Sequence, residues 1–178
     1  VAIPAAAAAA VVRANTGGSP RCFVPDGTNP VCMSMCSTQK AYQSGDAERT
    51  IALKDDQGAA ATAYRPGAKY TLSVETTGDE AATATRGFVL HARAGQNQVG
   101  AFENARAGGA PTKEGAPCKG GATHASGALK PSLTYDWVAP AAGTGDVTVY
   151  VVLVVGGGRG ACTFVTHEFA LAEDAAGS

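Results

Sequence analysis

The chain has 178 residues, and its 14 Lys and Arg residues nearly balance 15 Asp and Glu, for a formal net charge of −1. This length is that of one ordinary domain with a single hydrophobic core. The balanced charge excludes the basic face of a protein that wraps nucleic acid and the polybasic patch of one that binds an anionic membrane. We therefore expect no nucleic-acid partner.

The N-terminal segment, 1–18, is predicted to be an apolar, Ala-rich arm. Its apolar run stops at Arg13 and contains Pro4, so it is shorter than the roughly 20 apolar residues of a transmembrane helix. We predict no transmembrane segment. The composition fits the end of a secretory signal, an extended arm, a short helix or a strand lent to a neighbouring subunit, and it does not choose among them. The bulky residues of a possible assembly arm are Val1, Ile3, Val11 and Val12.

Five cysteines stand at Cys22, Cys32, Cys36, Cys118 and Cys162. In a chain this short they favour disulfides in an oxidising compartment, and hence a secreted, extracellular protein. Cys32 and Cys36 form only half of a zinc ligand set, so we predict no structural metal. Because five is odd, at least one thiol is free or pairs with another chain.

Strand signals begin after a segment rich in Gly, Pro, Ser and Asn, 17–45, which we predict to be irregular chain that caps the core. Tyr64–Gly67 is a turn signal, because Pro presets φ and Gly accepts a positive φ. Lys69–Glu75 alternates strictly and predicts a half-buried strand. Its inward residues are Tyr70, Leu72 and Val74.

Gly87–Arg93 predicts another strand, with Phe88, Leu90 and Ala92 as its core face. His91, on the other face, is expected to meet solvent or a second sheet. Gly100–Phe102 predicts a short strand, and 103–121 a polar, Gly-rich excursion that needs a tether.

The last three predicted strands are Leu133–Val138, Val147–Val155 and Cys162–Leu171. The first alternates, with Trp137 on the same face as Leu133, which favours Trp137 as a core residue over a sugar-stacking platform. The second is rich in β-branched residues and predicts a strand buried on both faces.

Many short strands without interleaved helices predict an all-β fold, an immunoglobulin-like antiparallel β-sandwich of about seven to nine strands, stapled by disulfides. The domain is expected to span 19–172, with a flexible tail at 173–178.

Two sets of residues could indicate a copper site or a catalytic nucleophile, but their sequence context argues against both. Cys162 and His167 have the spacing of some blue-copper ligands, but an odd separation along a strand places them on opposite faces. His124 and Ser126 suggest a nucleophile pair, yet no Gly-x-Ser-x-Gly elbow accompanies them, and a turn with local side-chain bonds explains them better. We predict no enzyme activity and no cofactor.

Acidic residues raise the possibility of a calcium site. Asp55 and Asp56 are adjacent and Glu80 follows, but the spaced acidic ligands of a calcium loop are absent from the sequence. A solvated loop is the better interpretation, and we predict no metal site.

Several short motifs occur in the order in which they occur in the reeler (reelin N-terminal) domain family, and the sequence resembles that family over about 32–171. The motifs are the Cys-x-x-Met of Cys32–Met35, the turn at Tyr64–Gly67, the strand Gly87–Arg93, Gly100–Phe102, and the series Cys118, Thr123-His124, Lys130 and Trp137–Pro140.

The resemblance implies a disulfide between Cys32 and Cys118, worth roughly 4 to 5 kcal/mol as an upper bound because it would close a long loop. It leaves the pairing of the other three cysteines open. It also implies structural roles for the motif residues Gly87, Phe88, Thr123, His124, Lys130, Trp137 and Pro140.

The function implied is that of a secreted, non-enzymatic extracellular matrix, adhesion or surface-binding module, whose partner is a protein or a surface glycan. The alternative is a structural subunit of an extracellular filament or appendage, assembled with other copies of itself through the N-terminal arm.

Overall fold

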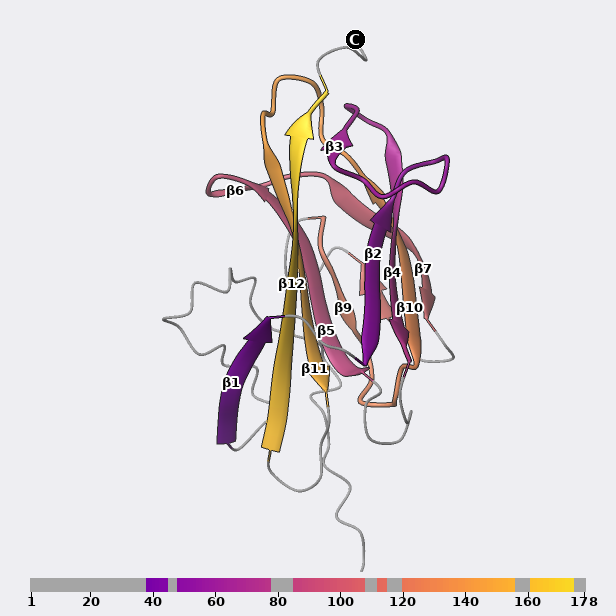
Figure 1. Ribbon diagram of the computed structural model, residues 1–178, viewed down its shortest axis with the longest axis vertical. Coiled ribbons are helices and arrows are strands. Elements are labelled where there is room, and N and C mark those ends of the chain that lie inside the picture. Colours follow the sequence, from indigo (N-terminus) through magenta and orange to yellow (C-terminus); the bar gives the residue numbers. More distant parts are fainter. Residues whose placement is uncertain are drawn as a thin grey trace, which may run out of the picture.

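The structure of the protein, a computed structural model, describes residues 38–44, 48–77, 85–107, 112–114, 120–155 and 161–174. Two β-sheets lie face to face and form a sandwich (Figure 1). The all-β sandwich predicted from the sequence is therefore confirmed. Within the described part of the chain there is no helix of the length and apolarity that a membrane crossing requires.

The described residues form twelve strands, more than the seven to nine predicted. They are β1 (Thr38–Ser44), β2 (Arg49–Lys54), β3 (Ala63–Tyr64), β4 (Lys69–Thr76), β5 (Thr85–Ala94), β6 (Asn97–Gln98), β7 (Ala101–Ala107), β8 (Thr112–Glu114), β9 (Ala122–His124), β10 (Ser132–Val138), β11 (Val147–Val155) and β12 (Ala161–Glu173). Most of the additional strands have two or three residues, too few for an alternation to be visible in the sequence.

The larger sheet has the strand order β1-β12-β11-β5-β9-β8, with β3 also beside β12 and β6 beside β5. The smaller sheet has the order β2-β4-β10-β7. Figure 1 shows the long strand β12 in front, between β1 and the smaller sheet. Sheet-on-sheet packing places the core between the two layers.

The predicted antiparallel arrangement holds for most strand pairs of the sandwich but not for two of them. Both β1 and β3 pair with β12 in parallel. Hairpins force antiparallel neighbours, whereas these strands reach β12 from distant parts of the sequence, so no short turn sets their direction. The prediction of irregular chain up to residue 45 is likewise wrong for Thr38–Ser44, a polar segment that becomes a strand through its pairing with β12.

The core is built from alternate residues of the long strands, as predicted. Tyr70, Leu72 and Val74 of β4 are buried, with exposed fractions of 4% or less. The other predicted inward residues that belong to this core are Phe88, Leu90, Ala92, Leu133, Tyr135 and Trp137. Periodicity of two is sufficient to assign these faces because it follows directly from the pleat of a strand.

The outer face of the larger sheet is also buried at its centre. Val89 of β5 pairs with Val152 of β11, and both are fully buried, although they lie opposite the core face. This confirms that β11 is buried on both faces over Val151–Val155. His91 was expected to meet solvent or the second sheet, but it is buried on this outer face and stacks on Tyr150 with ring centroids 4.9 Å apart.

Two glycines allow a close approach next to Trp137. Gly100 has a φ of 67°, and a Cβ there would lie 2.7 Å from the Trp137 Nε1 atom. Gly120 has a φ of 73°, and a Cβ there would collide with the carbonyl oxygen of Gly100. The Gly120 carbonyl accepts a hydrogen bond from the Phe102 amide at 2.7 Å. The chain after 119 is thereby held against β7, and only glycine fits at both positions.

Candidate functional site

The Thr-His pair of the sequence motif lies in β9, beside β5, and both side chains are buried. Thr123 Oγ1 donates a hydrogen bond to the Phe88 carbonyl at 2.8 Å. The Phe88 amide donates to His124 Nδ1 at 3.1 Å. Two consecutive side chains thus satisfy the backbone of one residue in the neighbouring strand, which is a structural task.

Lys130 is buried as well, with an exposed fraction of 1%. Its ammonium donates to the carbonyl oxygens of Arg86, Ser126 and Ala128 at 2.9, 2.8 and 2.7 Å. Its backbone amide donates to the Thr85 carbonyl at 2.8 Å. All three donors of the ammonium are therefore used, and the loop 125–131 is fastened to the start of β5.

Burial, together with the nearby charge of Arg86, lowers the pKa of Lys130 to about 8. Desolvation disfavours the charged form, while the three carbonyl dipoles favour it. The Lys130 side chain is a hydrogen-bond donor to the backbone, so its role is to hold the loop 125–131 against β5.

Ser126, considered above with His124 as a nucleophile pair, has a local role. Its Oγ accepts a hydrogen bond from the Ala128 amide two residues on, at 3.4 Å. The Nδ1 atom of His124 is occupied by the Phe88 amide. Both observations agree with the turn interpretation and give no support to a nucleophile activated by His124.

Of the cysteines, Cys22, Cys32, Cys36 and Cys118 lie outside the described residues, as do the arm residues Val1, Ile3, Val11 and Val12. The Cys32–Cys118 disulfide stays a prediction. Cys162 lies in β12, where its backbone is opposite Gln39 of β1. Among the residues that the structure describes, no three His, Cys, Asp or Glu side chains gather as a metal site would require.

The remaining motif residues are parts of the scaffold. Trp137 is fully buried, with its ring centroid 5.6 Å from that of Tyr70 and 6.1 Å from that of Tyr64. Gly87 pairs with Val154 in the larger sheet. The Pro140 carbonyl accepts a hydrogen bond from the Gly67 amide at 3.0 Å.

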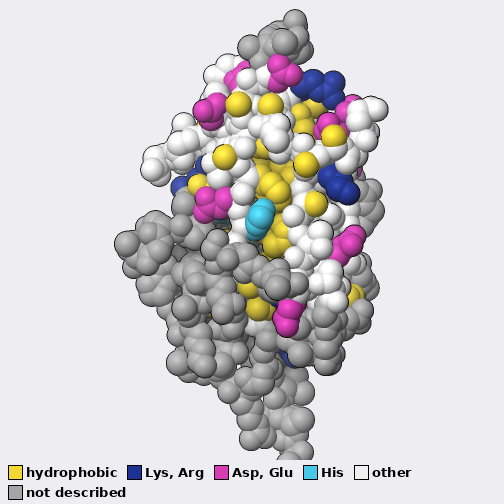
Figure 2. Space-filling view, viewed as in Figure 1, with side chains coloured by type: hydrophobic (Ala, Val, Ile, Leu, Met, Phe, Trp, Pro, Cys, Tyr) yellow, Lys and Arg dark blue, Asp and Glu magenta, His cyan; other side chains and the backbone are white. Residues whose placement is uncertain are grey.

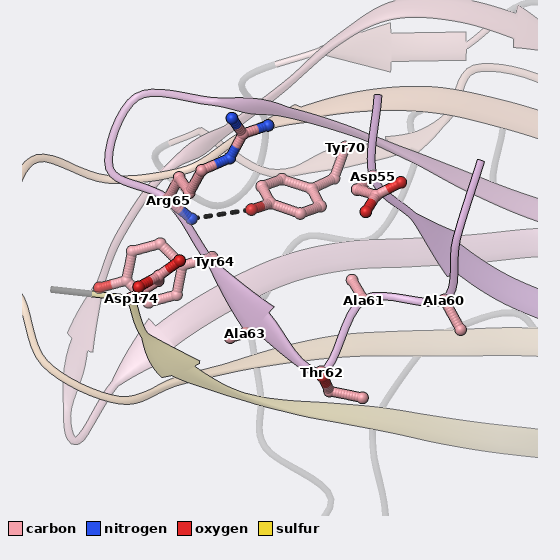
Figure 3. Close-up of a pocket in the computed structure, with 9 residues that line it drawn as sticks. All are labelled: Asp55, Ala60, Ala61, Thr62, Ala63, Tyr64, Arg65, Tyr70 and Asp174. Carbon is pink, nitrogen blue, oxygen red and sulfur yellow. Dashed lines mark hydrogen bonds between the residues drawn. The ribbon is translucent and has the colours of Figure 1, made fainter. Parts of the chain in front are cut away.

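A cavity of about 200 Å³ opens at the end of the sandwich where β3 and the last residues of β12 meet (Figure 3). Its lining comes from the β2–β3 loop, β3 and the residue after it, the start of β4, and the residue after β12. The lining residues are Asp55, Ala60, Ala61, Thr62, Ala63, Tyr64, Arg65, Tyr70 and Asp174. The cavity combines carboxylates, a guanidinium and two phenols with small apolar side chains.

Local hydrogen bonds hold this lining. Asp55 Oδ1 accepts from the amides of Gln57 and Ala59, each at 2.9 Å, which shapes the β2–β3 loop. The Arg65 amide donates to the Tyr70 hydroxyl at 2.8 Å, the bond drawn in Figure 3. The Arg65 guanidinium pairs with Asp56 at 3.0 Å, and both side chains are about half exposed.

Glu173 supports the wall behind Tyr64. Its carboxylate accepts hydrogen bonds from the amides of Gly143 and Gly145 at 2.7 and 2.6 Å. The Tyr64 hydroxyl donates to the Gly145 carbonyl at 2.7 Å and lies 3.3 Å from Glu173 Oε2. The two amides lower the pKa of Glu173, and burial together with the Glu173 charge raises the pKa of Tyr64 to about 12.

Glu173→Gln is expected to loosen the loop 141–146, because a neutral amide oxygen accepts hydrogen bonds less strongly than a carboxylate. The amides of Gly143 and Gly145 should then exchange with solvent faster. Amide hydrogen exchange followed by NMR measures this, with the Gly67 amide, which bonds to Pro140, as the internal reference. Unchanged exchange at both glycines would contradict the role given to Glu173.

Sequence reasoning did not find this cavity. Asp55 and Asp56 were singled out only as weak calcium candidates, and Asp174 lay in the segment predicted to be a flexible tail. The run of small residues Ala59–Ala63 was the one available signal, because small side chains leave space beside a backbone.

These features define an antiparallel-dominated β-sandwich module whose motif side chains are built into the scaffold, with a polar cavity at one end. A model of the Reeler domain matches residues 31–156, which is more than half of the chain. The chain belongs to the Reeler domain family. The resemblance noted from the sequence motifs is thereby confirmed.

Two solved structures have the same fold. The reeler domain of human F-spondin (fragment 1) is 22% identical, with a TM-score of 0.55, over 75% of this chain and 94% of that one. The Reelin-N domain of F-spondin is 21% identical, with a TM-score of 0.56, over 75% of this chain and 91% of that one. No curated protein matches the sequence.

Proposed function

We propose that this reeler-like module is secreted, is not an enzyme, and acts in an extracellular matrix, in adhesion or in surface binding. It would bind a protein or a surface glycan through the end of the sandwich that carries the cavity. The observation that supports this most is the cavity itself, where charged and hydroxyl groups gather beside exposed loops (Figure 3). Loops on a rigid scaffold are the usual place of binding residues.

The contacts of the motif residues support a binding role over catalysis. Thr123 and His124 bind the backbone of Phe88, and Lys130 binds three carbonyl groups. Trp137 lies in the core. These side chains maintain the scaffold, so recognition is left to the surface. Five cysteines in 178 residues support an oxidising, extracellular location.

A second candidate, the filament subunit, is favoured by the outer edge of β12. β1 covers this edge up to Thr166, and β3 covers it from Ala172. Between them, no described strand pairs with 167–171 on that side. An unpaired strand edge is a template for an added strand, and the arm of another copy, 1–12, has the apolar composition to provide one.

The surface beside this edge is partly apolar. Figure 2, which has β12 in front as in Figure 1, shows hydrophobic side chains and a histidine along the middle of this face. Phe169 is half-buried and packs against the core, with its ring centroid 4.6 Å from that of His167. Half-buried apolar groups beside a free edge are consistent with a docked strand.

One experiment separates the two candidates. The full chain and a variant lacking residues 1–14 are compared by sizing with light scattering and by binding to extracellular matrix and cell surfaces. For the binding module we expect a monomer in both cases, with equal binding. Assembly of the full chain that is lost on deletion would favour the filament, and failure to bind any surface without assembly would refute both.

A further inference from the structure

The cavity beside Tyr70 carries a recognition pattern more specific than a general binding surface. We propose that it binds one neutral sugar ring, the terminal unit of a surface glycan. This inference deepens the proposed function. It rests on that function for one premise, that the partner is an extracellular glycan.

Tyr70 supplies a buried donor. The residue is 4% exposed, and its hydroxyl oxygen accepts a hydrogen bond from the Arg65 amide. Among the described residues, no acceptor takes the proton of this hydroxyl. A ligand oxygen placed in the cavity can accept this proton in place of water, at a hydroxyl that the Arg65 amide already holds in position.

Asp55 and Arg65 add an acceptor and further donors. Asp55 uses Oδ1 for the Gln57 and Ala59 amides, and its Oδ2 has no donor among the described residues. The Arg65 guanidinium has five N–H donors and pairs through Nη2 with Asp56. Figure 3 shows Asp55 and Asp174 on opposite sides of the Tyr70 ring. Donors and acceptors therefore both border one space.

This mixture fits hydroxyl groups, because each hydroxyl donates one hydrogen bond and also accepts. A cationic side chain could use the carboxylates, but it would offer no acceptor to the Tyr70 hydroxyl or to the N–H groups of Arg65 that Asp56 does not use. Among the described residues, the carboxylates of Asp55, Asp56, Glu173 and Asp174 lie at this end, against the cations of Arg65 and of Lys54, whose backbone bridges Ala60. Their excess repels sulfated or carboxylated sugars.

The size limits the ligand to a single ring. The volume of about 200 Å³ equals that of about seven water molecules and lies below the roughly 300–1,000 Å³ of pockets for drug-sized ligands. The wall formed by Ala60, Ala61 and Ala63 carries only methyl groups. Such a wall can receive the C–H face of a sugar while the polar groups bind its hydroxyls.

The test measures binding of methyl glycosides to the 178-residue chain by ligand-observed NMR. Methyl glycosides of glucose, galactose, mannose and N-acetylglucosamine are the neutral probes, and methyl glucuronide and lysine amide are the charged comparators. We expect saturable binding of at least one neutral glycoside with a dissociation constant of about 1 mM, the range of a single small ligand. Both charged comparators should bind at least about tenfold more weakly.

Neighbouring alanines supply a matched pair of variants. Ala59 and Ala60 are both exposed, but only Ala60 lines the cavity. Ala60→Trp is expected to weaken glycoside binding at least about tenfold by filling the space, while Ala59→Trp should leave it unchanged. Tyr70→Phe, which keeps the ring against Trp137, should weaken binding up to about tenfold by removing one hydrogen bond.

Three results would overturn the inference: no saturable binding of any neutral glycoside, equal effects of Ala60→Trp and Ala59→Trp, or tighter binding of a charged comparator. The surface-binding assay described above keeps the two proposals apart. A protein that binds matrix or cells but none of the glycosides would refute the sugar site and leave the binding module standing.

Discussion

Trp137→Ala is expected to lower the free energy of unfolding by about 3–5 kcal/mol, the range for removing a large aromatic side chain from a core. Trp137 is fully buried in β10, and its ring contacts those of Tyr64 and Tyr70. Truncation would leave a cavity between the two sheets. Gly100, which lies against the Trp137 ring, has no side chain that could fill it. Urea unfolding followed by circular dichroism measures the loss.

The control for this prediction is Trp137→Phe. The Trp137 Nε1 atom is buried and has no acceptor in the described part of the chain, so replacing the indole by phenyl also removes an unsatisfied donor. The cost of Trp137→Phe should therefore be clearly smaller than that of Trp137→Ala. If Trp137→Ala cost less than about 1 kcal/mol, the usual effect of a point mutation, Trp137 would not be a core anchor.

Lys130→Met is expected to lower the free energy of unfolding by about 2–4 kcal/mol. The variant keeps the length of the side chain but leaves the carbonyls of Arg86, Ser126 and Ala128 without their donor. Charge-assisted hydrogen bonds contribute about 1.5–3 kcal/mol each, and water reaching the partly buried carbonyls offsets part of the sum. Lys54→Met, at an exposed position of β2, is the matched control and should change stability by less than about 0.5 kcal/mol.

The pH dependence of this variant gives an independent readout. The pKa of Lys130 is about 8 in the folded protein, below the roughly 10.4 of an unfolded lysine. Between these values the unfolded chain binds more protons, so this group makes the folded state more stable as pH rises from about 8 to about 10.4. Below pH 8 Lys130 is protonated in both the folded and the unfolded state, so it adds no pH dependence to the free energy of unfolding there.

Unfolding curves at pH 7.5 and at pH 9.5 measure this effect. The wild type should gain stability relative to Lys130→Met over that interval, because all other titrating groups are shared. A constant difference between the two proteins would show that Lys130 keeps an ordinary pKa and that its carbonyl partners fully offset its burial.

The sequence by itself determined the faces of the long strands. The alternation in Lys69–Glu75 assigned Tyr70, Leu72 and Val74 to the core, and the same reasoning placed Trp137 there. Periodicity is a local property, since the pleat of one strand turns successive side chains to opposite faces. The order of short motifs similarly indicated the Reeler family before any contact was known.

The tertiary structure alone decided what depends on residues distant in the sequence. The parallel pairing of β1 and β3 with β12 leaves no trace in the local pattern, because it arises between segments with no turn in common. Lys130 holds the loop 125–131 in place only because its Nζ atom lies 2.9 Å from the carbonyl oxygen of Arg86, which is 44 residues away in the sequence. The cavity exists because the β2–β3 loop meets the end of β12, and such a meeting is set by packing, which the alternation of side chains along one strand does not encode.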